Sequence, residues 1–110
     1  GGVTGDNASG TLTACYHATG TVSGPDGATG GVTGRNYTSL GAPVITACYW
    51  GDNGQEQGIG YNQAGTIGGT EQVTDGNWQN AANAMNAALQ SAGSEWQYEL
   101  TGALPTLKKQ

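Results

Sequence analysis

A nearly unchanged heptapeptide repeat is the feature of this chain that most restricts its fold. The segment GGVTGDN at Gly1–Asn7 returns as GGVTGRN at Gly30–Asn36. Each copy leads into a Thr-Ala-Cys-Tyr run, TACYH at Thr13–His17 and TACYW at Thr46–Trp50. Because the match covers both the loop and the strand-like segment after it, it indicates two related loop-plus-strand units that lie side by side. The second unit carries a four-residue insertion.

The glycine-rich heptapeptides lack the features of a phosphate-binding loop. Neither is followed by the Lys-Ser/Thr pair of a P-loop, and neither has the strand-then-helix context of a dinucleotide-binding motif. We therefore interpret them as turns that lead into strands. The asparagines at their ends, Asn7 and Asn36, each begin an Asn-x-Ser/Thr sequence and are candidate glycosylation sites.

The two cysteines lie in matching contexts and are candidates for a disulfide. A bond between Cys15 and Cys48 closes a loop of about 33 residues and stabilises the fold by roughly 3 to 4 kcal/mol. Such a cross-link suits a chain with few aliphatic residues, because its hydrophobic core is thin. The alternative is two buried free thiols. Two cysteines and one histidine do not make a four-ligand zinc set, so no metal site is expected.

Composition favours one ordered, acidic domain. The chain has 110 residues with 21 glycines, and only 10% of its residues are charged, which argues against disorder. A net charge of −5 with only three Lys and Arg residues disfavours nucleic acid and anionic membrane surfaces as partners. No apolar run approaches the ~20 residues of a membrane span. The lack of an initiator methionine fits a chain from which a leader has been removed.

Alternation of polar and apolar residues predicts strands in the first two thirds of the chain. The strongest are Thr11–Ala18 and Pro43–Trp50. Shorter strands bounded by glycine are expected at Thr19–Ser23, Gly58–Tyr61 and Gly65–Ile67. We expect the Gly-rich stretch over 51–75 to consist of loops and short strands.

An amphipathic helix is predicted over about 76–92 and ends at Gly93. Its apolar positions repeat at spacings of three, four and seven residues: Trp78, Ala81, Ala82, Met85, Ala88, Leu89 and Ala92. An alternating strand follows at Glu95–Thr101, and 102–110 is expected to be a tail. The predicted fold class is therefore α+β, a small antiparallel β-sheet with the helix packed on one face and the disulfide as a cross-link. Residues 1–110 form a single domain, in which 1–50 holds the two related units and 76–101 holds the helix and the strand.

The sequence offers little support for catalysis. His17 is the only histidine, and spacing alone supplies no carboxylate partner for it. Asp52 and Glu56, in the acidic loop over 51–58, could face one another as a carboxylate pair, but a solvated loop or a weak Ca²⁺ contact explains them as well. We therefore expect no enzyme activity and no cofactor. The candidates for stacking on a ligand are aromatic side chains: Trp50, Tyr61 and Tyr37.

Low charge and an abundance of Thr, Ser, Asn and Gly leave strand edges poorly protected against pairing with other chains. The sequence therefore favours a secreted, extracellular, self-associating structural subunit of a filament, pilus or coat. The alternative is a small secreted toxin or effector, or a carbohydrate-binding protein, that acts on the surface of other cells. The expected partners are copies of the chain itself or a cell-surface component.

Overall fold

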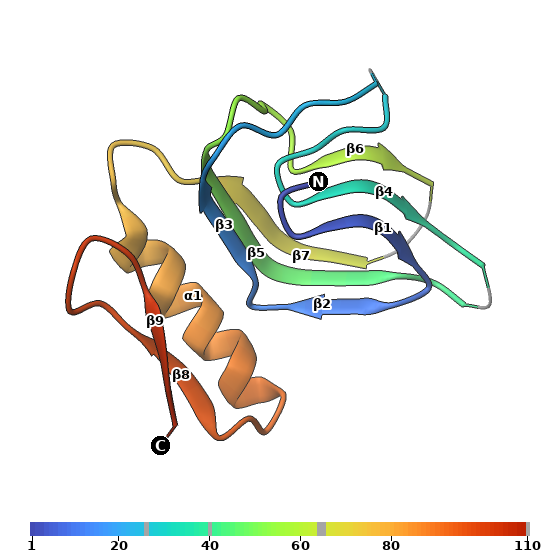
Figure 1. Cartoon of the computed structure of the whole chain (residues 1–110). Coiled ribbons are helices and arrows are strands. Elements are labelled where there is room, and N and C mark those ends of the chain that lie inside the picture. The colour runs from blue at the N-terminus through green and yellow to red at the C-terminus, as the bar shows by residue number, and fades with distance from the viewer. Residues whose placement is uncertain (26, 40, 64–65, 110) are drawn as a thin grey trace.

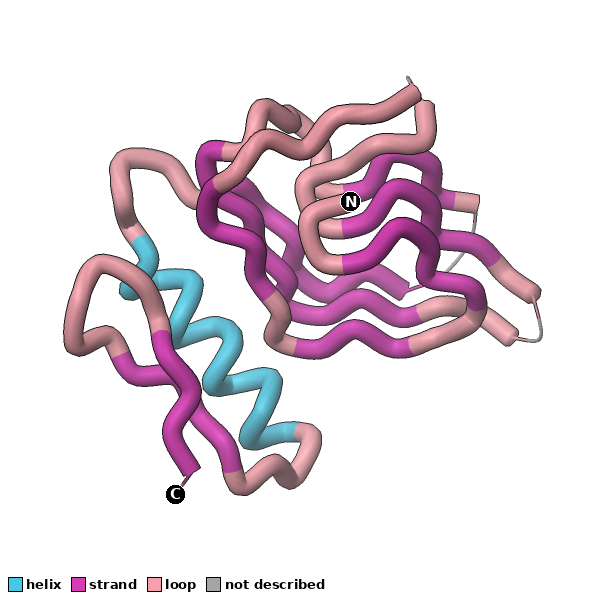
Figure 2. Tube along the Cα trace, viewed as in Figure 1, coloured by secondary structure: helices cyan, strands magenta, loops and turns pink. Residues whose placement is uncertain are grey.

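The computed structural model describes residues 1–25, 27–39, 41–63 and 66–109. These residues form a β-rich fold with one helix (Figure 1). In chain order the elements are β1 (Thr4–Ala8), β2 (Thr11–Thr13), β3 (Tyr16–Thr19), β4 (Thr33–Tyr37), β5 (Val44–Asp52), β6 (Ile59–Asn62), β7 (Thr66–Gln72), α1 (Trp78–Ser91), β8 (Trp96–Glu99) and β9 (Thr106–Lys109). Figure 2 shows the strands β1 to β7 gathered in one body, with the helix and the β8–β9 pair beside it.

Strands β1 to β7 form two sheets in which every pairing is parallel. The first sheet has the order β1-β4-β6. In the second sheet, β2 and β3 pair with one edge of β5, and β7 pairs with the other. The chain thus passes through both sheets in each of three successive coils: coil 1 (β1, β2 and β3), coil 2 (β4 and β5) and coil 3 (β6 and β7). This is the arrangement of a short parallel β-helix, in which each coil pairs with its neighbours.

The coils stack in a register that aligns the sequence repeats. In the first sheet Asn7 lies opposite Asn36, which lies opposite Asn62. In the second sheet the aligned apolar residues are Leu12, Ile45 and Ile67. The two heptapeptides are therefore neighbouring strands, and the chain contains a third, more divergent coil.

A corner within the second sheet recurs in all three coils. Ala14 and Ala47 have φ angles of 55° and 53°, and Gly69 has a φ of 86° at the equivalent place in coil 3. The left-handed conformation costs roughly 1–2 kcal/mol for an alanine, whereas glycine adopts it readily. The backbone N–H of Ala14 donates to Thr46 O at 2.9 Å, so the corner of coil 1 is held by the coil beside it.

The molecule has two hydrophobic cores, one on each face of the second sheet. The coil interior is built from Val32, Ile45, Cys48 and Trp50, with Leu12, Cys15 and Ile59 packed against them. The helix layer lies on the other face and is built from Ala14, Ala47, Tyr49, Trp78, Ala81 and Met85. Both faces of the second sheet are therefore covered.

The helix and the hairpin after it complete the helix layer. The expected helix is confirmed as α1, and Gly93, with a φ of 74°, ends it as predicted. Gly93 N–H donates to Gln90 O at 3.0 Å, which satisfies a carbonyl in the last turn. Strands β8 and β9 form an antiparallel pair. The Tyr98 hydroxyl donates to Ala14 O at 2.6 Å and ties this hairpin to coil 1.

The predicted antiparallel sheet and disulfide are both wrong. Alternation predicts where strands lie but carries no information on their direction, and repeated coils require parallel pairing. Cys15 and Cys48 occupy matching places in adjacent coils, approach to only 4.4 Å, and are free thiols. An S–S bond measures about 2.05 Å, so the cysteines do not cross-link the fold.

The smaller predictions have mixed outcomes. The strand expected at Thr19–Ser23 is wrong, since β3 ends at Thr19. The strand at Gly58–Tyr61 corresponds to β6, and the strand at Gly65–Ile67 overlaps β7, although Gly65 lies outside the described residues. The segment 102–110 contains β9. Within the described ranges, no helix has the length and apolar character needed to cross a membrane.

Candidate functional site

The coil stack ends in exposed strand edges on both sides. At one end β6 pairs only with β4, and β7 only with β5, as far as the described residues extend. At the other end β1 pairs only with β4, and β2 and β3 pair only with β5, within the same limits. Such edges present backbone N–H and C=O groups that can pair with another strand.

A ladder of asparagine side chains runs through the stack with a single polarity. Asn7 Nδ2 donates to Asn36 Oδ1 at 2.9 Å, and Asn36 Nδ2 donates to Asn62 Oδ1 at 2.9 Å. Asn7 and Asn36 are buried, whereas Asn62 is exposed. The ladder therefore ends with the Asn62 Nδ2 donor at the coil 3 edge and the Asn7 Oδ1 acceptor at the coil 1 edge.

Two further columns of side chains reach the coil 3 edge. Ile45 is fully buried in the middle coil, whereas Ile67, its neighbour in coil 3, is 43% exposed. Thr70 lies opposite Cys48 and continues the column of cysteines. Its Oγ1 is buried and has no hydrogen-bond partner among the described residues. A buried hydroxyl of this kind is uncommon in folded proteins.

The coil edges carry few charges. Glu71 is the one charged residue of β6 and β7, and Asp6 is the one charged residue of β1, β2 and β3. Arg35 Nε and Nη2 each donate to the Asp6 carboxylate at 2.9 Å, and this pairing holds the pKa of Asp6 below its usual value. The Arg35 guanidinium also lies 5.3 Å from the ring centroid of Tyr37. Lysine and proline, which commonly protect edge strands, are absent from β1, β2, β3, β6 and β7.

The predicted cysteine pair is close but unbonded. The Sγ atoms of Cys15 and Cys48 each lie 3.5 Å from the carbonyl oxygen two residues earlier, Thr13 O and Thr46 O. The adjacent Cys48 thiol lowers the pKa of Cys15 to about 7. The pKa of Cys48 is raised, first by the neighbouring Cys15 and then by burial. Cys15 is therefore the more acidic of the two thiols, and it is only half-buried.

The three candidate stacking residues do not form one site. Trp50 is 4% exposed and belongs to the coil interior, where its Nε1–H donates to Gln55 O at 2.8 Å. Tyr61 is exposed on β6, and Tyr37 is half-buried at the end of β4. Only the two tyrosines are thus accessible to a ligand.

The candidate glycosylation sites Asn7 and Asn36 form the buried part of the asparagine ladder. A glycan requires an exposed amide, and the ladder leaves no room for one on either side chain in the folded chain. Glycosylation stays a prediction, and the burial of both amides argues against it.

His17 is used to position a loop. Its Nδ1 lies 3.1 Å from Asn53 Nδ2, which also donates to Gly31 O at 3.2 Å. Because Asn53 Oδ1 accepts a hydrogen bond from Gln55 N–H, the Asn53 amide group has to donate to His17. Nδ1 of His17 is then the acceptor in this contact. The described residues contain no group of three or more His, Cys, Asp or Glu side chains that could hold a metal ion.

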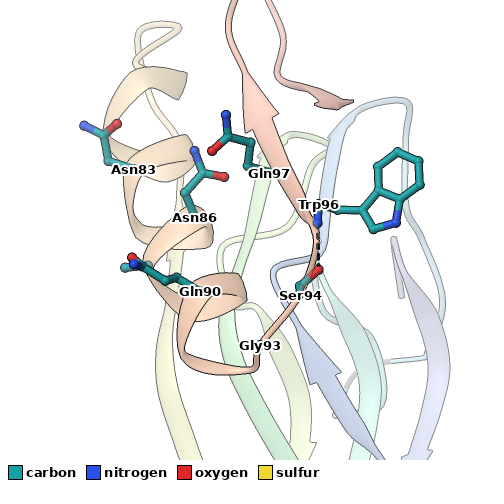
Figure 3. A pocket seen from close by; sticks show the side chains of 8 residues that line it. Asn83, Asn86, Gln90, Gly93, Ser94, Trp96 and Gln97 are labelled. Atoms are coloured by element: carbon teal, nitrogen blue, oxygen red, sulfur yellow. Dashed lines mark hydrogen bonds between the residues drawn. The ribbon is translucent and has the colours of Figure 1, made fainter. Parts of the chain in front are cut away.

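A groove of about 550 Å³ lies between α1 and β8 (Figure 3). Its polar lining comes mainly from side-chain amides, including Asn83, Asn86 and Gln90. Asn86 is already engaged, since its Nδ2 donates to Tyr98 O and its Oδ1 accepts from Tyr98 N–H. The indole of Trp96 is turned away from the helix amides in Figure 3. This groove was not predicted from the sequence, although the polar face of the amphipathic helix indicated a row of amides there.

Comparisons with models of protein families, with curated proteins and with solved structures found no match. Two surfaces stand out, the coil edges and the amide-lined groove. The coil edges carry matched groups at opposite ends of one stack, whereas no titratable side chain lines the groove among the described residues.

Proposed function

We propose that this chain is a secreted, non-catalytic structural subunit that associates with copies of itself. The observation that carries the proposal is the pair of parallel strand edges at the two ends of the coil stack, which have no pairing strand among the described residues. Pairing with another chain would satisfy the hydrogen-bonding groups of these edges and bury the apolar side chains beside them.

The position of the helix supports this proposal. Stacked-repeat proteins usually close their ends with capping segments that have a polar outer face. Here α1 packs against β5, β2 and β8 and covers a face of the second sheet (Figure 1). The edge formed by β6 and β7 is left to other partners, within the part of the chain that the structure describes.

The secreted location rests on composition, because the free cysteines remove the disulfide as an argument for an oxidising compartment. The non-catalytic role is supported by His17, which is engaged with Asn53.

The proposal is tested by sedimentation velocity over a range of micromolar concentrations, together with negative-stain electron microscopy. We expect the mass to rise with concentration above the 11.0 kDa of one chain and elongated assemblies to form at the highest concentrations. A single species of 11.0 kDa at every concentration would overturn the proposal. The location is checked by comparing the amount of the chain in culture medium and in washed cells of its source.

A second candidate function, carbohydrate binding at a cell surface, is favoured by the amide-lined groove. Exposed Asn83 and Gln90 can hydrogen-bond to hydroxyl groups without requiring charge on the ligand. An NMR titration with neutral oligosaccharides should shift the side-chain amide signals of these residues, and Gln90→Ala should weaken the effect. Shifts that are absent, or that are unchanged in Gln90→Ala, would remove this candidate.

A further inference from the structure

We infer that the copies assemble head to tail, with coil 3 of one copy stacked on coil 1 of the next in the register that relates coils within the chain. This inference rests on the proposed self-association and specifies its interface. The two contacting surfaces differ, so each copy keeps one free end of each kind. Such a heterologous contact does not close on itself unless the rotation per copy forms a ring, and it otherwise builds a filament.

The asparagine ladder fixes the polarity of this contact. Within the chain every donation runs from the lower-numbered coil to the next one, from Asn7 to Asn36 and from Asn36 to Asn62. Asn62 Nδ2 at the coil 3 edge then faces Asn7 Oδ1 of the next copy. A two-fold contact joins coil 3 to coil 3 or coil 1 to coil 1, and it continues the ladder in neither case.

The other columns also continue across the contact. The same register places Ile67 beside Leu12 of the next copy and extends the column of Leu12, Ile45 and Ile67. It covers the exposed part of Ile67 with another aliphatic side chain. It also places Thr70, whose Oγ1 has no partner among the described residues, beside the thiol of Cys15 of the next copy.

The charges at the two ends are compatible with this register. Glu71 aligns with Tyr49 in the chain, and Tyr49 aligns with Tyr16, so Glu71 faces Tyr16 of the next copy. By the same reasoning Tyr61 faces Asp6 of the next copy, because both align with Arg35. No two like charges lie opposite one another in this arrangement of the described strands.

Two substitutions at the coil 3 edge test the contact. Asn62→Asp keeps the oxygen that accepts from Asn36 but removes the donor that faces the next copy. Ile67→Lys places a charge on the β7 edge. Each is expected to weaken association by about tenfold or more in sedimentation velocity, while circular dichroism and the thermal midpoint stay near those of the wild-type chain. Leu107→Lys, on exposed strand β9, is the matched control and should associate as the wild type does.

A cross-linking experiment tests the register directly. In a Cys15→Ala background, Ala8→Cys lies on coil 1 and Gln63→Cys directly follows β6, and both positions are exposed. Ala8 aligns with Tyr37, and Gln63 lies beside the same residue in coil 3, so the two cysteines of one chain are two strands apart. That separation is about 10 Å, beyond the ~7 Å limit for a disulfide, so a bond between positions 8 and 63 has to join two copies.

Head-to-tail stacking predicts a series of oxidised oligomers from the double variant and none from either single variant. If the wild-type chain forms oligomers but the oxidised double variant shows no link between positions 8 and 63, the inference is overturned and the proposed function stands. The same holds if association is unchanged in Asn62→Asp and Ile67→Lys. Dimers from Ala8→Cys or Gln63→Cys alone would show a two-fold contact instead. A wild-type chain that stays monomeric would overturn both proposals.

Discussion

The coil interior and the helix layer share the second sheet but are stabilised differently. The coil interior repeats similar side chains from coil to coil, as in the column of Leu12, Ile45 and Ile67. On its sheet side the helix layer repeats Ala14 with Ala47 and Tyr16 with Tyr49. The residues that α1 contributes have no equivalents, and they make individual contacts such as that of Trp78 with Tyr16, whose ring centroids lie 5.0 Å apart. In the middle coil each position is supported by its equivalents in the coils on both sides, whereas each contact that α1 makes is made once.

This difference predicts different responses to substitution. A residue of the middle coil has neighbours on both sides, so its loss should affect the entire stack. The loss of a residue from the helix layer should loosen that layer while the backbone hydrogen bonds between the coils remain. Stability within one domain is often divided in this way among cooperative units.

The largest loss of stability is expected for Trp50→Ala. The indole fills the coil interior close to Gly31 and Gly58, and removing it leaves a cavity between the two sheets. We expect the free energy of unfolding to fall by about 3–5 kcal/mol, measured by urea denaturation. Hydrogen exchange should accelerate in β4, β5 and β6 together. Acceleration confined to β5 would contradict the cooperative behaviour of the coils.

Met85→Ala should reduce stability less than Trp50→Ala does, and its effect should be confined to the helix layer. Met85 is fully buried in the helix layer, and its replacement is expected to cost about 2–4 kcal/mol. Amide exchange should accelerate in α1 and β8 while the middle strand β5 stays protected. Trp96→Ala, at a 47% exposed position of the same layer, is the control and should change stability far less.

Asn36→Leu tests how much the asparagine ladder contributes to the stability of the coils. The substitution removes both ladder hydrogen bonds and leaves the buried Asn7 amide without its acceptor, for an expected cost of about 1–3 kcal/mol. Asn62→Leu removes only one bond at an exposed position and should cost under about 1 kcal/mol. Equal losses in the two variants, measured by urea denaturation, would contradict a special role for the middle coil.

One effect on stability appears only at high pH and belongs to the helix layer. Burial raises the pKa of Tyr98 to about 12, from an ordinary value of 10.0. The folded chain therefore holds this proton more firmly than the unfolded chain, so stability should fall as pH rises from about 10 to 12 and should not change on this account below 10. Urea midpoints of the wild type and Tyr98→Phe should converge over this range. Parallel curves would show that Tyr98 does not contribute to the pH dependence.

The sequence predicted the helix well and the coils poorly, for a physical reason. Helical periodicity is local, so Trp78, Ala81 and Met85 were sufficient to place α1. Parallel pairing is not local, because the aligned residues of neighbouring coils lie 22 to 33 positions apart. The heptapeptide repeat did identify β1 and β4 as related, but a repeat does not show by itself which way two strands run.

The third coil and the candidate site were harder to find. Coil 3 keeps only Gly60 and Asn62 from the first-sheet pattern and replaces the cysteine by Thr70. The low charge of the strands predicted exposed edges in general terms, but the ladder that gives those edges a polarity depends on Asn7, whose partner only the structure shows. Trp50 was predicted to stack on a ligand but lies in the coil interior, because an aromatic at the end of a strand fits either an interior or a surface position.

The central position of β5 has a consequence for synthesis of the chain. Coil 1 leaves the ribosome first, but its second-sheet strands β2 and β3 pair with β5, up to 33 residues later. At ordinary translation rates this interval lasts about 2 to 7 s. During that time β2 and β3 lack the neighbour they have in the folded chain. A cell that makes this protein in quantity therefore has to keep nascent chains from pairing with one another before each has completed its own middle coil.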